Sequence, residues 1–341
     1  MYIETPKNFP TQTAILEKPS AEYLPTSHWH LLGDLSVRPI WRSHCKPEPP
    51  LSTWVEVSEA TKRMEAILLW LEHWAKCNVY RNHTLVVVGG GILTDMGGLA
   101  ASLYLRGIAW HAWPTSLLAQ IDAGIGGKVA VNLGSGKNLA GAFHHPQRVA
   151  IARCFLDSLP QRHLEAGKWE LIKMALMVGD TAWAKSLLDC KTPCADDIKR
   201  AVKLKTDIVH EDFKEKNERR LLNLGHTFGH ALECASNFEL LHGEAVGLGV
   251  LAACILSENN GQAAFHIELI ETMGKQLAHF AVRMPTWEDC LPFILRDKKN
   301  ETGDEVRCII PVPGSKAIQK NISTETLKAV HAKLLLMLNV C

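Results

Sequence analysis

The chain has 341 residues, enough for two domains, because single hydrophobic cores stop growing near ~250–300 residues. Lys and Arg (37) nearly balance Asp and Glu (36), which gives no electrostatic reason to expect nucleic acid or a membrane as a partner. The longest apolar stretch, 245–256, is shorter than the ~20 residues of a membrane span and predicts a buried helix. The ten cysteines show no CxxC spacing, and the start of the chain shows no secretory signal. We therefore expect reduced thiols and a cytoplasmic location.

The amino-terminal half alternates between predicted strands and helices. Eight prolines before residue 51 break any long element there, and only 30–34 is expected to form a strand. Residues 59–76 carry apolar side chains at the i, i+3, i+4, i+7 spacing of an amphipathic helix. The β-branched run 84–88 predicts a buried strand, which leads through three glycines into a helix over 95–105. Two more strands are expected, over 108–113 and 147–152.

This order of elements predicts two domains. Strand, glycine turn, helix and strand in succession are typical of a parallel α/β sheet. From about residue 157 the pattern changes to long helical segments with few candidate strands. We predict an α/β nucleotide-binding domain over 1–156 and a mostly helical domain over 157–341.

The glycines 89–91 follow a buried strand directly. Glycines let the backbone approach a ligand, and the start of the next helix offers free N–H groups to a phosphate. The string GGGILTDMGG differs from the dinucleotide fingerprint G-x-G-x-x-G, and a tight strand-to-helix turn would explain the same residues.

A second glycine-rich segment carries two lysines nine residues apart, Lys128 and Lys137. Ammonium groups and backbone N–H groups in such a setting suggest that both converge on an anion. The alternative is a solvated loop with incidental lysines.

Histidines give the strongest signal. His226 and His230 are four residues apart and share one face of a predicted helix, which Asn223 joins at i−3. His242 follows a short break and begins a second apolar helix. Three histidines in 17 residues, with carboxylates nearby, favour a divalent metal over three unrelated core histidines.

Nine short strings resemble those of the 3-dehydroquinate synthase family and occur in that family's order, over about 86–313. They are GGGILTDMGG, YLRG, DAGIGGK, GKN, GAF, ELIK, NLGHTFGHALE, LHGEAVGLG and RDKKN. The resemblance implies an α/β N-terminal Rossmann-like nucleotide-binding domain, whose first part looks short here, plus a mostly α-helical C-terminal metal- and substrate-binding domain.

The resemblance also implies a reaction. The family converts 3-deoxy-arabino-heptulosonate 7-phosphate to 3-dehydroquinate in the shikimate pathway, through transient oxidation by NAD, phosphate elimination and intramolecular aldol closure. The cofactors expected from it are NAD and zinc, with cobalt as an alternative metal. The expected partners are a small sugar acid phosphate and a second copy of the chain in a homodimer.

The site residues implied by the resemblance fall into three groups. Zinc ligands are implied at Glu170, His226 and His242. Arg106 is implied to reach into the neighbouring subunit, and Arg219, Asn223 and Lys205 to hold the substrate carboxylate. The full substrate and catalytic set is Arg106, Lys128, Asn138, Lys173, Lys205, Arg219, Asn223, His230 and Lys298. The cofactor-binding set is Asp34, Glu56, Gly90, Gly91, Asp95, Thr115, Ser116, Asp122, Lys128 and Lys137.

Several alternatives stay open at this point. A cyclase of sedoheptulose 7-phosphate and an aminodehydroquinate synthase share the motifs. Outside the cyclases, a metal-dependent polyol dehydrogenase and a non-catalytic relative are the other readings. Two features depart from the family pattern: Trp169 stands beside Glu170 where a small residue is usual, and Asp34 and Glu56 are closer in sequence than the family's acidic pair.

Overall fold

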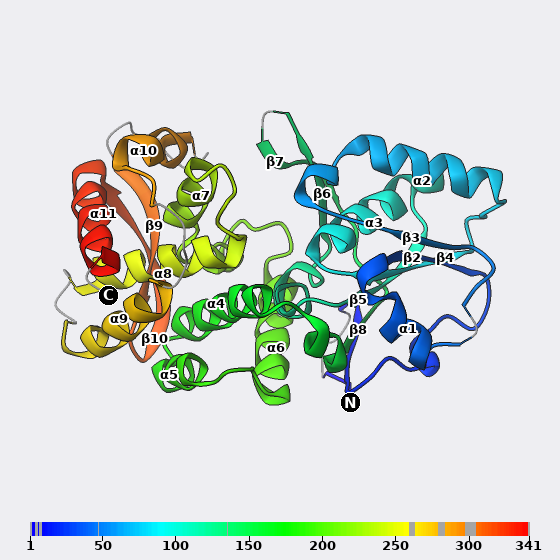
Figure 1. The fold of residues 1–341 in the computed structure, drawn as a ribbon, viewed down its shortest axis with the longest axis horizontal. Helices are drawn as coiled ribbons and strands as arrows, with labels where there is room; N and C mark the ends of the chain where they lie inside the picture. Colours follow the sequence, from blue (N-terminus) through cyan, green and yellow to red (C-terminus); the bar gives the residue numbers. More distant parts are fainter. Residues whose placement is uncertain are drawn as a thin grey trace. The chain divides into compact units, whose positions relative to one another are not determined.

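The computed structural model describes residues 2–3, 6, 9–46, 48–134, 136–258, 263–278, 284–296 and 305–339. The chain forms two compact units (Figure 1). Unit 1 comprises Met1–Leu164 and Cys194–Phe213, and unit 2 comprises Glu165–Pro193 and Lys214–Cys341. The predicted assignment of NAD to residues 1–156 and of zinc and substrate to 157–341 stays a prediction.

Unit 1 is built on a six-stranded parallel sheet, as the alternating pattern predicts. The strand order is β1-β8-β5-β4-β2-β3. The central strand β4 is buried along its whole apolar run, which explains its uninterrupted β-branched sequence. The bounds are β1 (Gln12–Leu16), β2 (Trp29–Asp34), β3 (Ser52–Val55), β4 (Thr84–Gly89), β5 (Ala109–Pro114) and β8 (Arg148–Ala152).

Helices cover both faces of this sheet (Figure 1). Trp41 of α1 lies in a core cluster with Val86 and Val88, on one face of β4. Side chains alternate along a strand, so Val87 faces the other way, where α3 lies so close that a Cβ on Gly97 would come within 2.7 Å of Val87. The helical elements are η1 (Ala21–Tyr23), η2 (Leu35–Val37), α1 (Arg38–His44), η3 (Glu59–Thr61), α2 (Met64–Lys76), α3 (Gly91–Leu103), η4 (Tyr104–Arg106), η5 (Ala119–Ala123), η6 (Arg153–Ser158) and α6 (Ala195–Glu211).

Two predicted helices have different bounds in the structure. The helix expected over 59–76 is split into η3 and α2. The helix expected over 95–105 begins at Gly91, because Gly90 forms the N-cap directly after β4. It ends at Leu103, and Leu105 and Arg106 then take left-handed backbone angles (φ 49° and 65°), which no helix continues.

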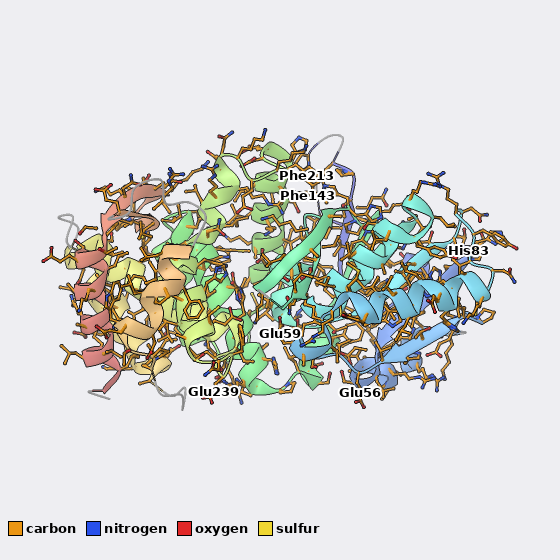
Figure 2. The ribbon with its side chains drawn as sticks, turned by 90° about the horizontal axis from the view of Figure 1, so that it is seen from above. Glu56, Glu59, His83, Phe143, Phe213 and Glu239 are labelled. Carbon is orange, nitrogen blue, oxygen red and sulfur yellow. The ribbon has the colours of Figure 1, made fainter. Side chains whose placement is uncertain are left out.

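An antiparallel hairpin lies between β5 and β8 in the chain, formed by β6 (Lys128–Leu133) and β7 (Gly136–Phe143). Its β6 strand packs on α3, where Gly98 leaves room for the side chain of Val129. Beside the hairpin, the rings of Phe143 and Phe213 lie edge to face with centroids 5.0 Å apart (Figure 2).

Unit 2 is mostly helical and surrounds α8, whose residues 243–257 are all buried. This confirms the buried helix expected over 245–256. No helix in the described ranges combines the length and apolar character that crossing a membrane requires. The elements are α4 (Gln161–Met177), α5 (Thr181–Asp189), η7 (Glu218–Asn223), α7 (His226–Ala235), α8 (His242–Glu258), α9 (Ala263–Leu277), α10 (Trp287–Arg296), α11 (Thr324–Asn339) and a hairpin of β9 (Glu305–Val312) and β10 (Ser315–Ser323).

Glycines bring the neighbours of α8 into backbone contact with it. A Cβ on Gly243 would lie 1.9 Å from the carbonyl oxygen of Ala166 in α4. A Cβ on Gly249 would lie equally close, 1.9 Å, to the carbonyl oxygen of Gly225, just before α7. Gly247 leaves the space that the ring of Trp169 fills, so the large residue beside Glu170 is accommodated. The starts of α7 and α8 and the middle of α4 are thereby held together.

Candidate active site and metal centre

Three ligand side chains meet where these helices of unit 2 converge. Glu170 comes from the middle of α4, while His226 and His242 are the first residues of α7 and α8. Each offers one ligand atom, and these atoms all lie within 4.8 Å of one another. The structure thus brings together the three residues that the resemblance implies as zinc ligands.

The geometry and burial of this cluster fit a metal ion. In a tetrahedral zinc site with bonds of ~2.1 Å, neighbouring ligand atoms lie ~3.4 Å apart. His242 Nε2 lies 3.4 Å and His226 Nε2 lies 3.9 Å from Glu170 Oε1. This oxygen is buried and accepts no hydrogen bond from the described residues. A buried carboxylate faced by two imidazole nitrogens is chemically suited to a divalent cation.

Charges around the cluster set the protonation of its members. Burial alone would raise the pKa of Glu170, but Lys173, 2.5 Å away in α4, and the two histidines hold it well below its usual range. Burial and Lys173 lower the pKa of His226 well below 6.5, so this ring is neutral. Burial acts to lower the pKa of His242 as well, but the carboxylates of Glu170 and Glu233 outweigh burial and raise that pKa to about 10. Metal binding at His242 therefore has to displace a proton.

Of the other predicted residues of unit 2, His230 lies beside the cluster. His230, one turn along α7, has its ring centroid 5.0 Å from that of His226 and 5.8 Å from that of His242. Arg219 is buried (1% exposed) in η7. Lys298 falls outside the described residues.

The prediction that Asn223 shares the helix of His226 and His230 is wrong. Asn223 ends η7, and Gly225, with a left-handed φ of 77°, separates it from α7. The amide of Asn223 donates to Glu215 Oε1 at 2.7 Å. A left-handed residue cannot continue a right-handed helix, and this interrupts the i−3 spacing.

In unit 1, the candidate nucleotide residues lie at the carboxyl edge of the sheet. The chain leaves β2 toward β3 and leaves β4 toward β5, in opposite directions, so a crevice is expected between the ends of β2 and β4. Asp34 ends β2, and Gly90 and Gly91 follow β4. Asp34 accepts hydrogen bonds from the backbone N–H and hydroxyl of Ser36 at 2.9 and 2.7 Å.

The remaining candidates at this edge follow β3 and β5. Glu56 comes directly after β3 and is exposed (Figure 2). The buried Thr115 follows β5, and its N–H donates to the carbonyl of Gly89. The side chain of Ser116 accepts from the N–H of Ala119 at 3.3 Å.

A buried lysine that sequence reasoning missed links two candidate residues of unit 1. Lys62 is 5% exposed, and its Nζ lies 2.6 Å from both Asp95 Oδ2 and Asn138 Oδ1. Burial raises the pKa of Asp95 to about 6, although Lys62 acts to lower it. In sequence, Lys62 looks like any charged residue on an amphipathic helix, and no spacing signal distinguishes it.

Glu59, also missed, extends this network. Its Oε1 accepts from the amide of Asn132 at 2.7 Å and lies 3.6 Å from Lys137 Nζ. Lys128 begins β6, whereas Lys137 lies next to the hairpin turn, so the antiparallel pairing puts the two lysine backbones near opposite ends of the hairpin. The convergence of the two lysines on one anion stays a prediction.

The last three sequence candidates of unit 1 are Asp122, Lys205 and Arg106. Lys205 of α6 pairs with Asp122 of η5. Arg106, in the strained left-handed turn after α3, is exposed. Its neighbours Leu103 and Leu105 are exposed as well, at 45% and 44%.

Family models match most of the chain. One described as 3-dehydroquinate synthase N-terminal matches residues 52–166, and one described as 3-dehydroquinate synthase C-terminal matches 167–300. The 3-dehydroquinate synthase of Solibacter usitatus is 39% identical over 74% of this chain and 74% of its own length. That of Latilactobacillus sakei is 38% identical over 72% of this chain and 70% of its own length.

Solved structures of other cyclases share the fold. A 2-deoxy-scyllo-inosose synthase complexed with carbaglucose-6-phosphate, NAD+ and Co2+ has a TM-score of 0.82 at 24% identity, over 97% of this chain and 98% of that one. The 2-epi-5-epi-valiolone synthase of Streptomyces hygroscopicus with NAD+ and Zn2+ bound has a TM-score of 0.79 at 26% identity, over 98% and 99%. The two matching family models and the identity to curated relatives, together with this fold, establish that the chain belongs to the 3-dehydroquinate synthase family.

Proposed function

We propose that this protein is a 3-dehydroquinate synthase, which converts 3-deoxy-arabino-heptulosonate 7-phosphate to 3-dehydroquinate and releases phosphate. The observation that carries the proposal is the cluster of Glu170, His226 and His242, with Lys173 beside it, in a chain of this family. The sequence similarity to curated 3-dehydroquinate synthases exceeds the similarity to the solved inosose and valiolone synthases.

Two cofactors serve this reaction. Zinc, held by Glu170, His226 and His242, supplies Lewis acidity at a substrate hydroxyl, and NAD supplies a reversible hydride acceptor. The neutral ring of His226 and the ionised carboxylate of Glu170 are in the protonation states that a divalent metal requires. We expect Gly90 and Gly91, at the start of α3, to face the NAD pyrophosphate, and Asp34, at the end of β2, to accept from a ribose hydroxyl.

Residues of unit 2 also bind and orient the substrate. Arg219, which is buried, and Asn223 hold the carboxylate through charge-assisted hydrogen bonds. His230 donates a hydrogen bond to the phosphate or moves a proton near it, since an imidazole can do either near neutral pH.

The decisive experiment supplies purified protein with the heptulosonate phosphate, NAD and zinc. We expect stoichiometric phosphate and 3-dehydroquinate with no accumulation of reduced NAD, because the hydride returns to the substrate. His242→Ala should lose both bound zinc and turnover. Accumulation of reduced NAD would instead indicate a polyol dehydrogenase, and full activity of metal-free protein would contradict the ligand assignment.

We further propose a homodimer in which Arg106 serves the neighbouring subunit. Support comes from its strained backbone, which costs ~1–2 kcal/mol, and from the exposed leucines beside it, which a second copy would cover. Mixing inactive Arg106→Ala with inactive Lys128→Ala subunits should restore part of the activity, because a hybrid dimer holds one intact site. Verified hybrids without recovered activity would contradict the shared site.

A further inference from the structure

The second ring nitrogen of His242 faces a carboxylate that belongs to none of the predicted sites. His242 Nδ1 lies 3.3 Å from Glu233 Oε2, while Nε2 on the other side of the ring lies 3.4 Å from Glu170 Oε1. Glu233 is 4% exposed and lies in the last turn of α7, seven residues after His226. Its carboxylate stands behind the ring and outside the three-residue ligand cluster.

His226 shows the same arrangement with a different acceptor. Its Nδ1 lies 3.2 Å from the carbonyl oxygen of Leu224, and its Nε2 points toward Glu170. A carbonyl oxygen can only accept, so Nδ1 of His226 carries the hydrogen and Nε2 presents its lone pair. A carboxylate imposes the same tautomer on His242 and adds a negative charge.

The position of Glu233 is unfavourable unless it has a task. A carboxylate in the last turn of a helix meets the negative end of the helix dipole, and burial adds a desolvation cost. Such a residue persists where a nearby positive charge or a positioned hydrogen bond offsets these costs. The imidazole of His242, 3.3 Å from Glu233 Oε2, is one such group.

We propose that Glu233 is a positioning residue of the metal centre: its carboxylate accepts the Nδ1–H of His242, fixes the ring's orientation and tautomer, and so presents Nε2 to zinc. The inference rests on the proposed metal-dependent function. One helix, α7, thereby supplies both a ligand, His226, and the anchor of a second ligand on α8. The two ligands therefore move together when α7 shifts.

Zinc affinity measured by competition with a chelating dye tests this without using activity. Glu233→Gln keeps the size and an acceptor oxygen but removes the charge, and we expect a loss of affinity of ~10–100-fold. Glu233→Asp keeps the charge but withdraws it by one methylene, so it should give a smaller loss. The matched control is Glu258→Gln, which removes a carboxylate of α8 that pairs with Lys333, and it should bind zinc like the wild type.

The cobalt-substituted proteins provide a second readout. Glu233→Gln removes the charge behind His242 and should therefore alter the visible absorption of bound Co(II). Glu258→Gln should leave that absorption unchanged. Wild-type zinc affinity and an unchanged cobalt spectrum in folded Glu233→Gln would overturn the positioning role while leaving the proposed function intact. If Glu233→Gln fails to fold, wild-type affinity and spectrum in Glu233→Asp would overturn it in the same way. A wild-type protein that binds no zinc would overturn both the metal centre and this role.

Discussion

Replacing Lys62 by Met tests the buried network of unit 1. Lys62 Nζ lies 2.6 Å from Asp95 Oδ2, and the Asp95 side chain is 17% exposed. Methionine has nearly the length of the lysine stem, so the substitution removes the charge while largely keeping the packed volume. Asp95 then has no ammonium group at that position to oppose its desolvation.

The magnitude follows from the pKa of Asp95, which burial raises from 3.8 to about 6. A carboxyl with a raised folded-state pKa binds its proton more tightly in the folded protein, so stability is lost as pH rises from 3.8 to that pKa. In wild type this loss ends near pH 6. Without Lys62 the pKa is higher and the loss continues. The pH-dependent destabilisation of Lys62→Met relative to wild type is therefore near zero below pH 6. It reaches at most ~1.4 kcal/mol at pH 7 and at most ~2.7 kcal/mol at pH 8.

Urea unfolding of wild type and Lys62→Met at pH 6, 7 and 8, followed by tryptophan fluorescence, measures this difference. The same comparison in an Asp95→Asn background is the control, because no carboxyl remains there to titrate and the pH-dependent part should vanish. The reasoning is refuted if the destabilisation is constant across the three pH values, or if it persists with the same slope in the Asp95→Asn background.

Three other predictions address different parts of the molecule. Burial lowers the pKa of His30 from 6.5 to about 4, so the unfolded chain takes up a proton here before the folded protein does. This group therefore costs ~2 kcal/mol of stability by pH 5. His30→Phe should flatten the dependence of the unfolding free energy on pH between 7 and 5, and an unchanged slope would contradict this reasoning. Gly243→Ala should force α8 away from Ala166, destabilise the fold by ~1–3 kcal/mol and weaken zinc binding. Gly274→Ala, whose added Cβ meets only the end of a methionine side chain, should leave both stability and zinc affinity nearly unchanged. Equal zinc affinity in the two variants would show that the close backbone contact at Gly243 does not hold the metal ligands in place. Arg219→Ala should lower kcat/KM for the heptulosonate phosphate by on the order of a hundredfold, because the substrate carboxylate is left without its cation. Zinc and NAD affinity should stay nearly unchanged. If the wild type turned over sedoheptulose 7-phosphate as well as the heptulosonate phosphate, a site built for a carboxylate would be contradicted.

The parts of the fold that could be predicted are those with a strong local pattern. The β-branched run of β4, its glycine turn and the break between α7 and α8 all follow from neighbouring residues. By contrast, β1 was missed because it lies in the proline-interrupted start of the chain and pairs with β8, some 136 residues later (Thr13 with Val149). Such a strand is stabilised by a distant partner that no local window contains. The hairpin of β9 and β10 was missed in a region where helical patterns dominate.

The same distinction separates the site residues. The spacing of His226 and His230 is a property of one helix and could be read directly. Lys62 and Glu233 become informative only through burial and through contacts with Asp95 and His242, which are tertiary properties. The misplacement of Asn223 has a local cause, the left-handed Gly225, but glycine identity alone does not reveal its backbone angle.

The interleaving of the two units constrains the order in which they can form during synthesis. Unit 1 is completed only by residues 194–213, after the chain has already entered unit 2. Until α6 has left the ribosome, Asp122 lacks the charge of Lys205, and the surface that α6 covers on η5 stays exposed. Folding of unit 1 while the chain is still being made is therefore deferred until about two-thirds of the protein exists. For the same reason, a separately expressed unit 1 would have to join 1–164 directly to 194–213 through a designed linker, rather than stop at the first boundary.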